Sequence, residues 1–398
     1  MKAAPIQRAK FLRSTLERDN NVLVVDFSDT LQGQDTSKVI DLMPNVSTGE
    51  YVFRGKVNVK EIDPIAAAEY GKPFFDVRGK TDLEIQDFLK QAEFDFPLWF
   101  KNDNDFSMSR VLDYNPPFIL QIAGCNFHDG SDSGGCWYCF VDDTSNDGVV
   151  GSGKTFLGIN DTIDSMVDAR AKVKDVYAEH DIDLNMRVLR ISGGEPTIAL
   201  DWILNLWREI NSRGLDFVGQ IDSNLSTGYL VDSFEKQGIF EPNTLQKLAE
   251  YPIKVLTAIK GTDEENLQSN VQASIHMETQ EYSLIKFLES GFDIYPQMYN
   301  PNPDTLDAYL SHMDSRIENF SLKVHIGPLN LYGPNIARLT VQANMLGRDP
   351  EQHIAEKTQE WDSNFANGNE VLNSYLQRNY GVGYKEMARP DVELTLKR

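Results

Sequence analysis

The stretch FILQIAGCNFHDGSDSGGCWYC, residues 118–139, joins an apolar run to every cysteine in the chain. Its first seven residues have the composition of a buried strand. Cys125 follows directly, ten residues separate it from Cys136, and two residues separate Cys136 from Cys139. Because three is an odd number, these cysteines cannot form a complete set of disulfides. In a reducing compartment, metal binding by their thiolates is favoured instead.

Two kinds of metal site fit these residues. With His128 the spacing becomes C-x-x-H, seven residues, C-x-x-C, and four such ligands could close a tetrahedral zinc site. The three cysteines alone could instead hold three irons of a [4Fe–4S] cluster and leave the fourth iron open. Position favours the cluster, because Cys125 follows the first strand of a βα series. Residues at the carboxyl ends of such strands face the site of chemistry.

Strands and helices alternate on the carboxyl side of this stretch. The sequence predicts six strands, at residues 118–124, 186–192, 217–222, 253–260, 293–299 and 321–329. Helical spacing of apolar residues predicts helices at 161–180, 200–214, 280–291 and 304–313. This alternation indicates an α/β fold with βα units around a parallel sheet, either as a partial barrel or as a doubly wound sheet.

The two ends of the chain carry weaker signals. A strand is expected at residues 21–27 and a helix at 81–94, but residues 1–115 match no module and have no assigned role. From about residue 331 the chain looks like helical decoration. We therefore divide the chain into an N-terminal extension (1–115), a core domain (116–330) and a C-terminal helical extension (331–398).

The second predicted strand ends in SGGEPT, residues 192–197. Two glycines would expose backbone N–H and C=O groups beside the carboxylate of Glu195. Such a turn is suited to a ligand that carries both an amine and a carboxylate. The simpler alternative is a glycine turn with Pro196 at the start of a helix.

CWYC (136–139) followed by SGGEP (192–196) resembles the radical S-adenosylmethionine superfamily, over roughly residues 117–329. The resemblance implies a partial (β/α)6 TIM-like barrel with N-terminal and C-terminal extensions. It also implies a [4Fe–4S] cluster on Cys125, Cys136 and Cys139, with S-adenosylmethionine as the second cofactor. The residues implied for binding that cofactor are the turn residues Gly193, Gly194, Glu195 and Pro196, and the aromatic Tyr138 before the last cysteine.

The same resemblance implies further cofactor contacts at later strand ends. Ser223 and Asn224 follow the third strand, and Lys260 in IKGTDEEN (259–266) follows the fourth. The segment HIGPLN (325–330) is a candidate to run alongside the adenine of the cofactor. One departure is the ten-residue gap after the first cysteine, where three residues are usual. Its Gly, Ser and Asp content predicts a flexible loop, with His128 and Asp129 facing solvent or substrate.

The reaction implied is reductive cleavage of S-adenosylmethionine, giving methionine and a 5′-deoxyadenosyl radical that abstracts hydrogen from a substrate. An electron donor such as a ferredoxin or flavodoxin would be the partner. The substrate stays open between a partner protein's glycyl radical site, a nucleic acid or peptide, and a small metabolite.

GVVGSGKT, residues 148–155, matches the phosphate-binding pattern G-x-x-x-x-G-K-[ST] letter for letter. A working loop needs a hydrophobic strand before its first glycine and a helix that begins at its Gly-Lys-Thr. The preceding VDDTSND (141–147) is acidic and predicts a loop, and the next helix is expected only near residues 160–162. We therefore expect a flexible connection with Lys154 near the cysteines, and not an ATPase.

Composition narrows the remaining classes. The 398 residues carry a formal net charge of -22, so binding of bulk nucleic acid is disfavoured. No apolar run approaches the roughly 20 residues needed to span a bilayer. The basic N-terminus has no apolar core of the signal-peptide kind. The expectation is a cytoplasmic protein without a membrane partner.

Overall fold

The fold was analysed in a computed structural model. It describes residues 5–25, 52–53, 60–61, 118–128, 130, 134–151, 153–178, 187–386 and 392–397. The helix expected at 81–94 lies outside the described residues, as does most of the proposed N-terminal extension.

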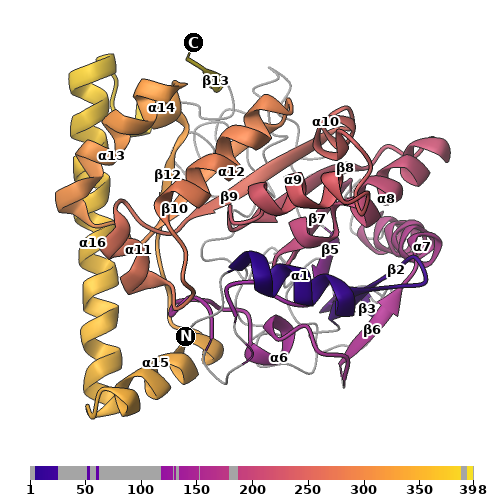
Figure 1. The fold of residues 1–398 in the computed structure, drawn as a ribbon, viewed down its shortest axis with the longest axis horizontal. Helices are drawn as coiled ribbons and strands as arrows, with labels where there is room; N and C mark the ends of the chain where they lie inside the picture. The colour runs from indigo at the N-terminus through magenta and orange to yellow at the C-terminus, as the bar shows by residue number, and fades with distance from the viewer. Residues whose placement is uncertain are drawn as a thin grey trace.

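A mostly parallel sheet forms the centre of the molecule (Figure 1). Its six parallel strands pair in chain order. They are β5 (Phe118–Ile122), β7 (Val188–Gly193), β8 (Val218–Ser223), β9 (Ile253–Ile259), β10 (Asp293–Tyr299) and β12 (His325–Gly327). The predicted alternation of parallel strands and helices is confirmed. Closure of these strands into a partial barrel remains a prediction.

The first described residues extend this sheet beyond β5. Strand β2 (Asn21–Val25) pairs antiparallel with β5, with the two-residue β1 (Glu17–Arg18) and with β6 (Lys154–Leu157). Helix α1 (Pro5–Leu16) precedes them and buries Ala9, Leu12 and Leu16. Residues 5–25 are therefore built into the same sheet as the strand that leads to Cys125.

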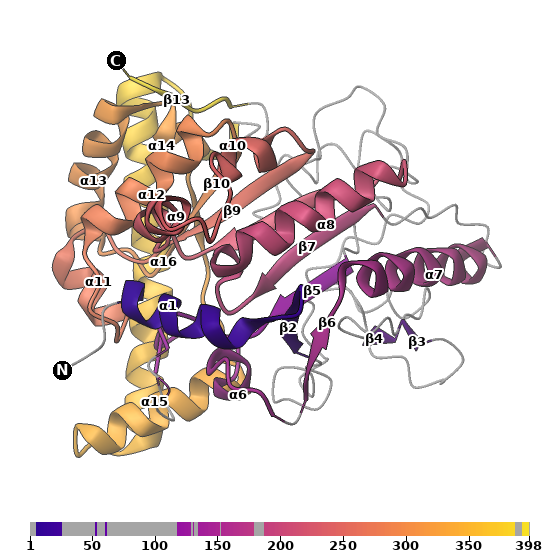
Figure 2. The same ribbon diagram turned by 45° about the vertical axis from the view of Figure 1, so that its right-hand side comes forward.

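Helices cover one face of the sheet because alternate strand residues there are apolar. Ile191, Ile221 and Val255 are buried on that face. The helices are α7 (Ile159–Ala178), α8 (Leu200–Ser212), α9 (Gly228–Lys236), α10 (Thr244–Ala249) and α12 (Met277–Glu289). Figure 2 shows α8 lying along β7. As the sequence predicts, α8 buries Ile203, Leu206, Trp207 and Ile210, and Gly214 with φ +64° follows its end.

Two helices make up most of the C-terminal segment, and they pack against the core. Helix α15 (Gly333–Met345) is followed by the long α16 (Pro350–Tyr380), which runs along one side of the molecule in yellow (Figure 1). Trp361, Leu372 and Leu376 of α16 are buried in the main core. The remaining elements are α6 (Asp143–Asn146), η3 (Pro196–Ala199), α11 (Glu264–Asn270), α13 (Pro303–Arg316), α14 (Phe320–Lys323), η4 (Tyr384–Glu386), and the short strand pairs β3 (Val52–Phe53) with β4 (Lys60–Glu61) and β11 (Ile317–Glu318) with β13 (Thr395–Leu396).

The strand predicted at 321–329 is wrong over its first residues. Residues 320–323 form α14, and only His325–Gly327 is a strand. The Asp314 carboxylate explains the difference, because it accepts hydrogen bonds from the backbone N–H of Ser321 at 2.9 Å and from its hydroxyl at 2.5 Å. These bonds hold a helical turn where apolar alternation alone suggested extended chain.

Candidate cofactor site

The three thiols are free and lie around the carboxyl end of β5. Cys125 follows Gly124, whose φ of +85° turns the chain out of the strand. Cys136 forms an isolated antiparallel bridge with Val271, directly after α11. The backbone N–H of Cys139 donates to the Cys136 carbonyl at 3.0 Å. Segments far apart in the sequence therefore fix where each thiol stands.

The electrostatic surroundings of the thiols combine burial with nearby cations. Burial raises the pKa of the Cys125 thiol well above its usual range, and the other two cysteines add to that rise. Burial also raises the pKa of Cys136, while the Lys260 ammonium and the Arg338 guanidinium oppose the rise. At Cys136 burial outweighs the two cations, so in the metal-free chain the cations only lessen the cost of forming a thiolate there.

The glycines of the β7 turn serve close backbone packing. A Cβ at Gly194 would lie 1.9 Å from the carbonyl oxygen of Gly124, and a Cβ at Gly193 would lie 2.2 Å from that of Ile122. The N–H of Gly194 donates to Ile122 O, and the N–H of Glu195 to Gly124 O, both at 2.9 Å. The turn is therefore fastened to the segment that ends in Cys125. Its N–H groups, which the sequence suggested were exposed, are engaged.

The Glu195 side chain is fully buried and points into the protein. Its carboxylate accepts hydrogen bonds from the Asn224 N–H at 2.7 Å, the Ser223 hydroxyl at 3.1 Å, and the Thr197 hydroxyl and N–H. Burial raises the pKa of Glu195 to about 7, although these hydrogen bonds lower it in part. Pro196 begins η3, as the simpler interpretation of the turn expected. In this structure Glu195 holds the ends of β7 and β8 together.

Asn224 connects that carboxylate to the first cysteine. Its side-chain amide donates to Cys125 Sγ at 3.7 Å and to Asn126 Oδ1 at 3.1 Å. Ser223 and Asn224, both predicted cofactor contacts, therefore lie beside the cysteine segment.

An aromatic group with one cation borders the other side of the thiols. The Tyr138 ring centroid is 6.2 Å from that of Tyr299 and 6.4 Å from that of Trp361. Lys260 Nζ lies 5.2 Å from the Tyr138 centroid and 5.8 Å from the Tyr299 centroid. The buried Tyr138 hydroxyl has no hydrogen-bond partner in the described part of the chain. The predicted residues Tyr138 and Lys260 thus come together next to Cys136.

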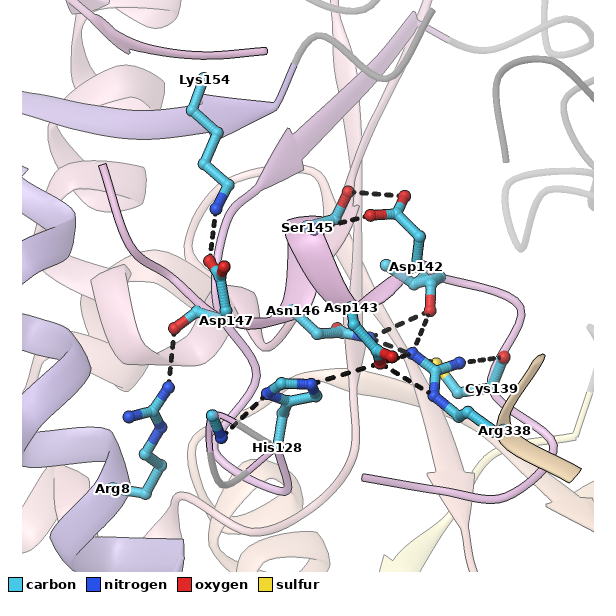
Figure 3. A network of polar contacts seen from close by, with 12 residues as sticks. Arg8, His128, Cys139, Asp142, Asp143, Ser145, Asn146, Asp147, Lys154 and Arg338 are labelled. Carbon is cyan, nitrogen blue, oxygen red and sulfur yellow. Dashed lines mark hydrogen bonds and ion pairs between the residues drawn. The ribbon is translucent and has the colours of Figure 1, made fainter. Parts of the chain in front are cut away.

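The segment after Cys139 contains the features that sequence reasoning missed (Figure 3). VDDTSND forms the short helix α6 in place of the expected loop, because the Asp142 carboxylate caps it by accepting from Ser145 N–H at 2.8 Å. Asp143 accepts hydrogen bonds from His128 and from Arg338 of α15. No local pattern could reveal Arg338, since it lies 195 residues from Asp143.

His128 is buried, so the solvent-facing half of its prediction is wrong, and the substrate-facing half stays a prediction. Its side chain is 1% exposed, its Nε2 lies 3.2 Å from Asp143 Oδ1, and its Nδ1 accepts from the Gly130 N–H at 3.1 Å. Both ring nitrogens are thereby engaged. Among the described residues, no three Cys, His, Asp or Glu side chains are grouped to share one ion. In this structure His128 is bonded to Asp143 and Gly130, and the zinc site with His128 stays a prediction. Asp129 lies outside the described residues.

The GVVGSGKT segment lacks the geometry of a phosphate-binding loop. Lys154 begins strand β6, and helix α7 begins only at Ile159. The Lys154 ammonium pairs with Asp147 and donates to the Val149 carbonyl at 2.8 Å. Because residues 154–157 are a strand paired with β2, the segment is not simply the flexible connection that the sequence predicted.

The predicted segment HIGPLN reaches the aromatic group around Tyr138, because Gly327 pairs with Tyr299 in the sheet and a Cβ at Gly327 would lie 2.6 Å from the Tyr299 ring. His325 is buried, and its Nδ1 is 2.6 Å from the Tyr384 hydroxyl. Among the described helices, none combines the length and the apolar composition that a membrane span requires.

No family model and no curated protein sequence matches the chain. The solved structures that are similar to it include two of anSMEcpe. A hexahistidine-tagged form of anSMEcpe with bound AdoMet has 17% identity and a TM-score of 0.32, over 56% of this chain and 57% of that one. Native anSMEcpe with bound AdoMet has 16% identity and a TM-score of 0.30, over 64% and 66%. The chain thus spans less than two thirds of either neighbour. A likeness of this size carries no conclusion about activity or substrate.

Proposed function

We propose that the chain is an enzyme of the radical S-adenosylmethionine type. Cys125, Cys136 and Cys139 would hold a [4Fe–4S] cluster, and S-adenosylmethionine would bind beside it. The observation that carries this proposal is the set of three free thiols on bonded segments around the end of the first parallel strand. The ends of β7 and β8 are fastened to the same segment.

The donor set fits a cluster better than a single ion. In a cluster each thiolate binds a different iron, so the sulfurs need not crowd around one centre. Amide groups of Asn224 and Asn146 approach the sulfurs of Cys125 and Cys139 at 3.7 and 3.8 Å. Such hydrogen bonds stabilise thiolate ligands and tune the potential of the metal group.

A cluster held there would supply one electron to the sulfonium of S-adenosylmethionine. The chain's own part is to hold and shield the reactants. The N–H groups of residues 194 and 195 are bonded to Ile122 and Gly124, so an incoming ammonium would have to donate to the carbonyl groups of the turn. Glu195 positions Ser223 and Asn224, and the unpartnered Tyr138 hydroxyl is available to a ligand. An external one-electron donor, of the ferredoxin or flavodoxin kind, completes the proposal.

The deciding experiment is anaerobic reconstitution with iron and sulfide, followed by metal analysis and visible and paramagnetic resonance spectra. We expect about four irons per chain in the wild type and almost none in the triple Cys→Ala variant. The reduced, loaded protein should release 5′-deoxyadenosine from S-adenosylmethionine. His128→Gln, which keeps a donor toward Asp143, is the matched control and should retain iron. Zinc in place of iron, lost in both variants, would contradict the proposal.

A further inference from the structure

Arg338 is a buried cation that reaches the cysteine segment from the C-terminal helices. Its side chain is 1% exposed. Its guanidinium donates to the Cys139 carbonyl at 2.5 Å, the Val141 carbonyl at 2.6 Å and Asp143 Oδ1 at 2.5 Å. Figure 3 shows these bonds converging beside the last cysteine. Two of the three acceptors are backbone groups of the chain that leaves Cys139.

Backbone hydrogen bonds connect helix α6, which follows the segment held by Arg338, to the first cysteine. The N–H groups of Gly124 and Cys125 donate to the carbonyls of Ser145 and Asn146, both at 2.8 Å. The Asn146 side chain donates to the Val141 carbonyl at 3.1 Å and approaches Cys139 Sγ. Arg338 is therefore bonded to the segment 139–146, and this segment contains Cys139 and contacts Cys125.

The energetic balance of this arrangement makes it sensitive to substitution. Burying a guanidinium is costly, and the cost is offset only when each donor finds an acceptor. Arg338 meets this condition with one carboxylate and two carbonyls in a forked geometry that a lysine cannot reproduce. Removing it would leave the carbonyls of Cys139 and Val141 without this donor in a buried setting.

We propose that Arg338 is a positioning residue that fixes the backbone at Cys139 and, through α6, the relative placement of Cys125 and Cys139. The C-terminal helical segment thereby controls the geometry of the cysteine site. The inference about the cluster rests on the proposed function. The inference about thiol placement concerns the metal-free chain as well.

The test compares the full-length variants Arg338→Met, Arg338→Lys and Asp143→Asn with the wild type. Arg348→Met is the matched control, because that side chain is 57% exposed and lies just beyond α15. In metal-free protein kept anaerobic, the alkylation rate of each cysteine by iodoacetamide is followed by peptide mass spectrometry. We expect Arg338→Lys, which keeps the cation that favours the reactive thiolate, to raise the Cys139 rate about tenfold through local opening, and Arg348→Met to leave it unchanged.

A second readout separates charge from position in the iron-loaded protein. Losing a buried cation should lower the reduction potential of the cluster in Arg338→Met. Arg338→Lys keeps the charge and should keep the potential near the wild-type value. It should nevertheless show faster Cys139 alkylation, because the fork is lost. If Arg338→Met does not fold, Arg338→Lys and Asp143→Asn carry the same alkylation comparison.

The two proposals fail in different ways. Cys139 alkylation within about twofold of the wild type in every folded variant, with full iron content, would overturn the positioning role. Absence of iron from the reconstituted wild type would instead overturn the proposed function. In that case the alkylation rates of the metal-free chains still decide the role of Arg338.

Discussion

At the scale of single residues, two glycines and one arginine determine where the cysteine segment lies. Gly194 allows the β7 turn to touch the backbone at Gly124, and Arg338 holds the chain after Cys139. The two adjacent glycines in the sequence already indicate a close backbone approach, because only a residue without Cβ permits one. The sequence suggested that the turn grips a ligand, whereas the structure shows that it also fastens two strand ends together.

Gly194→Ala tests that packing. The new Cβ would lie 1.9 Å from Gly124 O, so the hydrogen bonds from residues 194 and 195 to β5 must break. We expect a loss of about 2 kcal/mol or more in the free energy of unfolding, together with reduced iron uptake. Urea denaturation and metal analysis measure the two effects. Gly151→Ala, where the nearest neighbour of a new Cβ is 4.0 Å away, is the control and should be neutral. Equal stability of the two variants would refute the packing role.

At the scale of elements, the regular strands were predictable and the supports between them were not. Strands such as Asp293–Tyr299 follow from short apolar runs bounded by turn residues, and α8 from its apolar periodicity. Helix α6 was not predicted, because its four polar residues show no apolar periodicity. Their helical conformation depends on the N-cap at Asp142. The contacts of Arg338 and Trp361 join distant segments, and one sequence gives no sign of such pairs.

The GVVGSGKT segment gives a prediction at the same scale. A strand that begins at Lys154 cannot present a helix N-terminus to phosphates, and Asp147 neutralises the lysine. We therefore expect no binding of magnesium ATP in titration calorimetry, either by the wild type or by Lys154→Ala. Lys154→Ala should still lower stability by about 1 kcal/mol, because it removes the ion pair that the 2%-exposed Lys154 side chain makes with Asp147. Micromolar ATP binding that the substitution abolishes would reverse this interpretation.

At the scale of the whole molecule, the two ends of the parallel strands have different tasks. The carboxyl ends gather the cysteines, the glycine turn and Lys260. The amino ends hold an ion-pair group in which Asp293 contacts Lys254 at 2.7 Å and also pairs with Lys323. Both lysines are buried, at 6% and 2% exposure, so the carboxylate compensates two desolvated cations. Substitution at this end should affect the stability of the fold and leave the proposed chemistry intact.

Asp293→Asn tests this separation. Removing the charge takes the carboxylate from two buried lysines, and because Asp293 itself is 38% exposed we expect a loss of about 1–2 kcal/mol at pH 7. Burial works to raise the pKa of Asp293, but Lys323 and Lys254 outweigh it and hold the pKa below its usual range. A lowered carboxyl pKa gives stability that is present above the unfolded value and is lost as pH falls through the folded one. The difference between wild type and variant should therefore shrink below about pH 4.

Urea denaturation across pH measures this difference in stability, with the exposed pair of Asp307 and Arg378 as control. Asp307→Asn should change stability by less than about 1 kcal/mol. Where Asp293→Asn is folded, its iron content should equal that of the wild type, and a parallel loss of iron would show that the two ends are not independent.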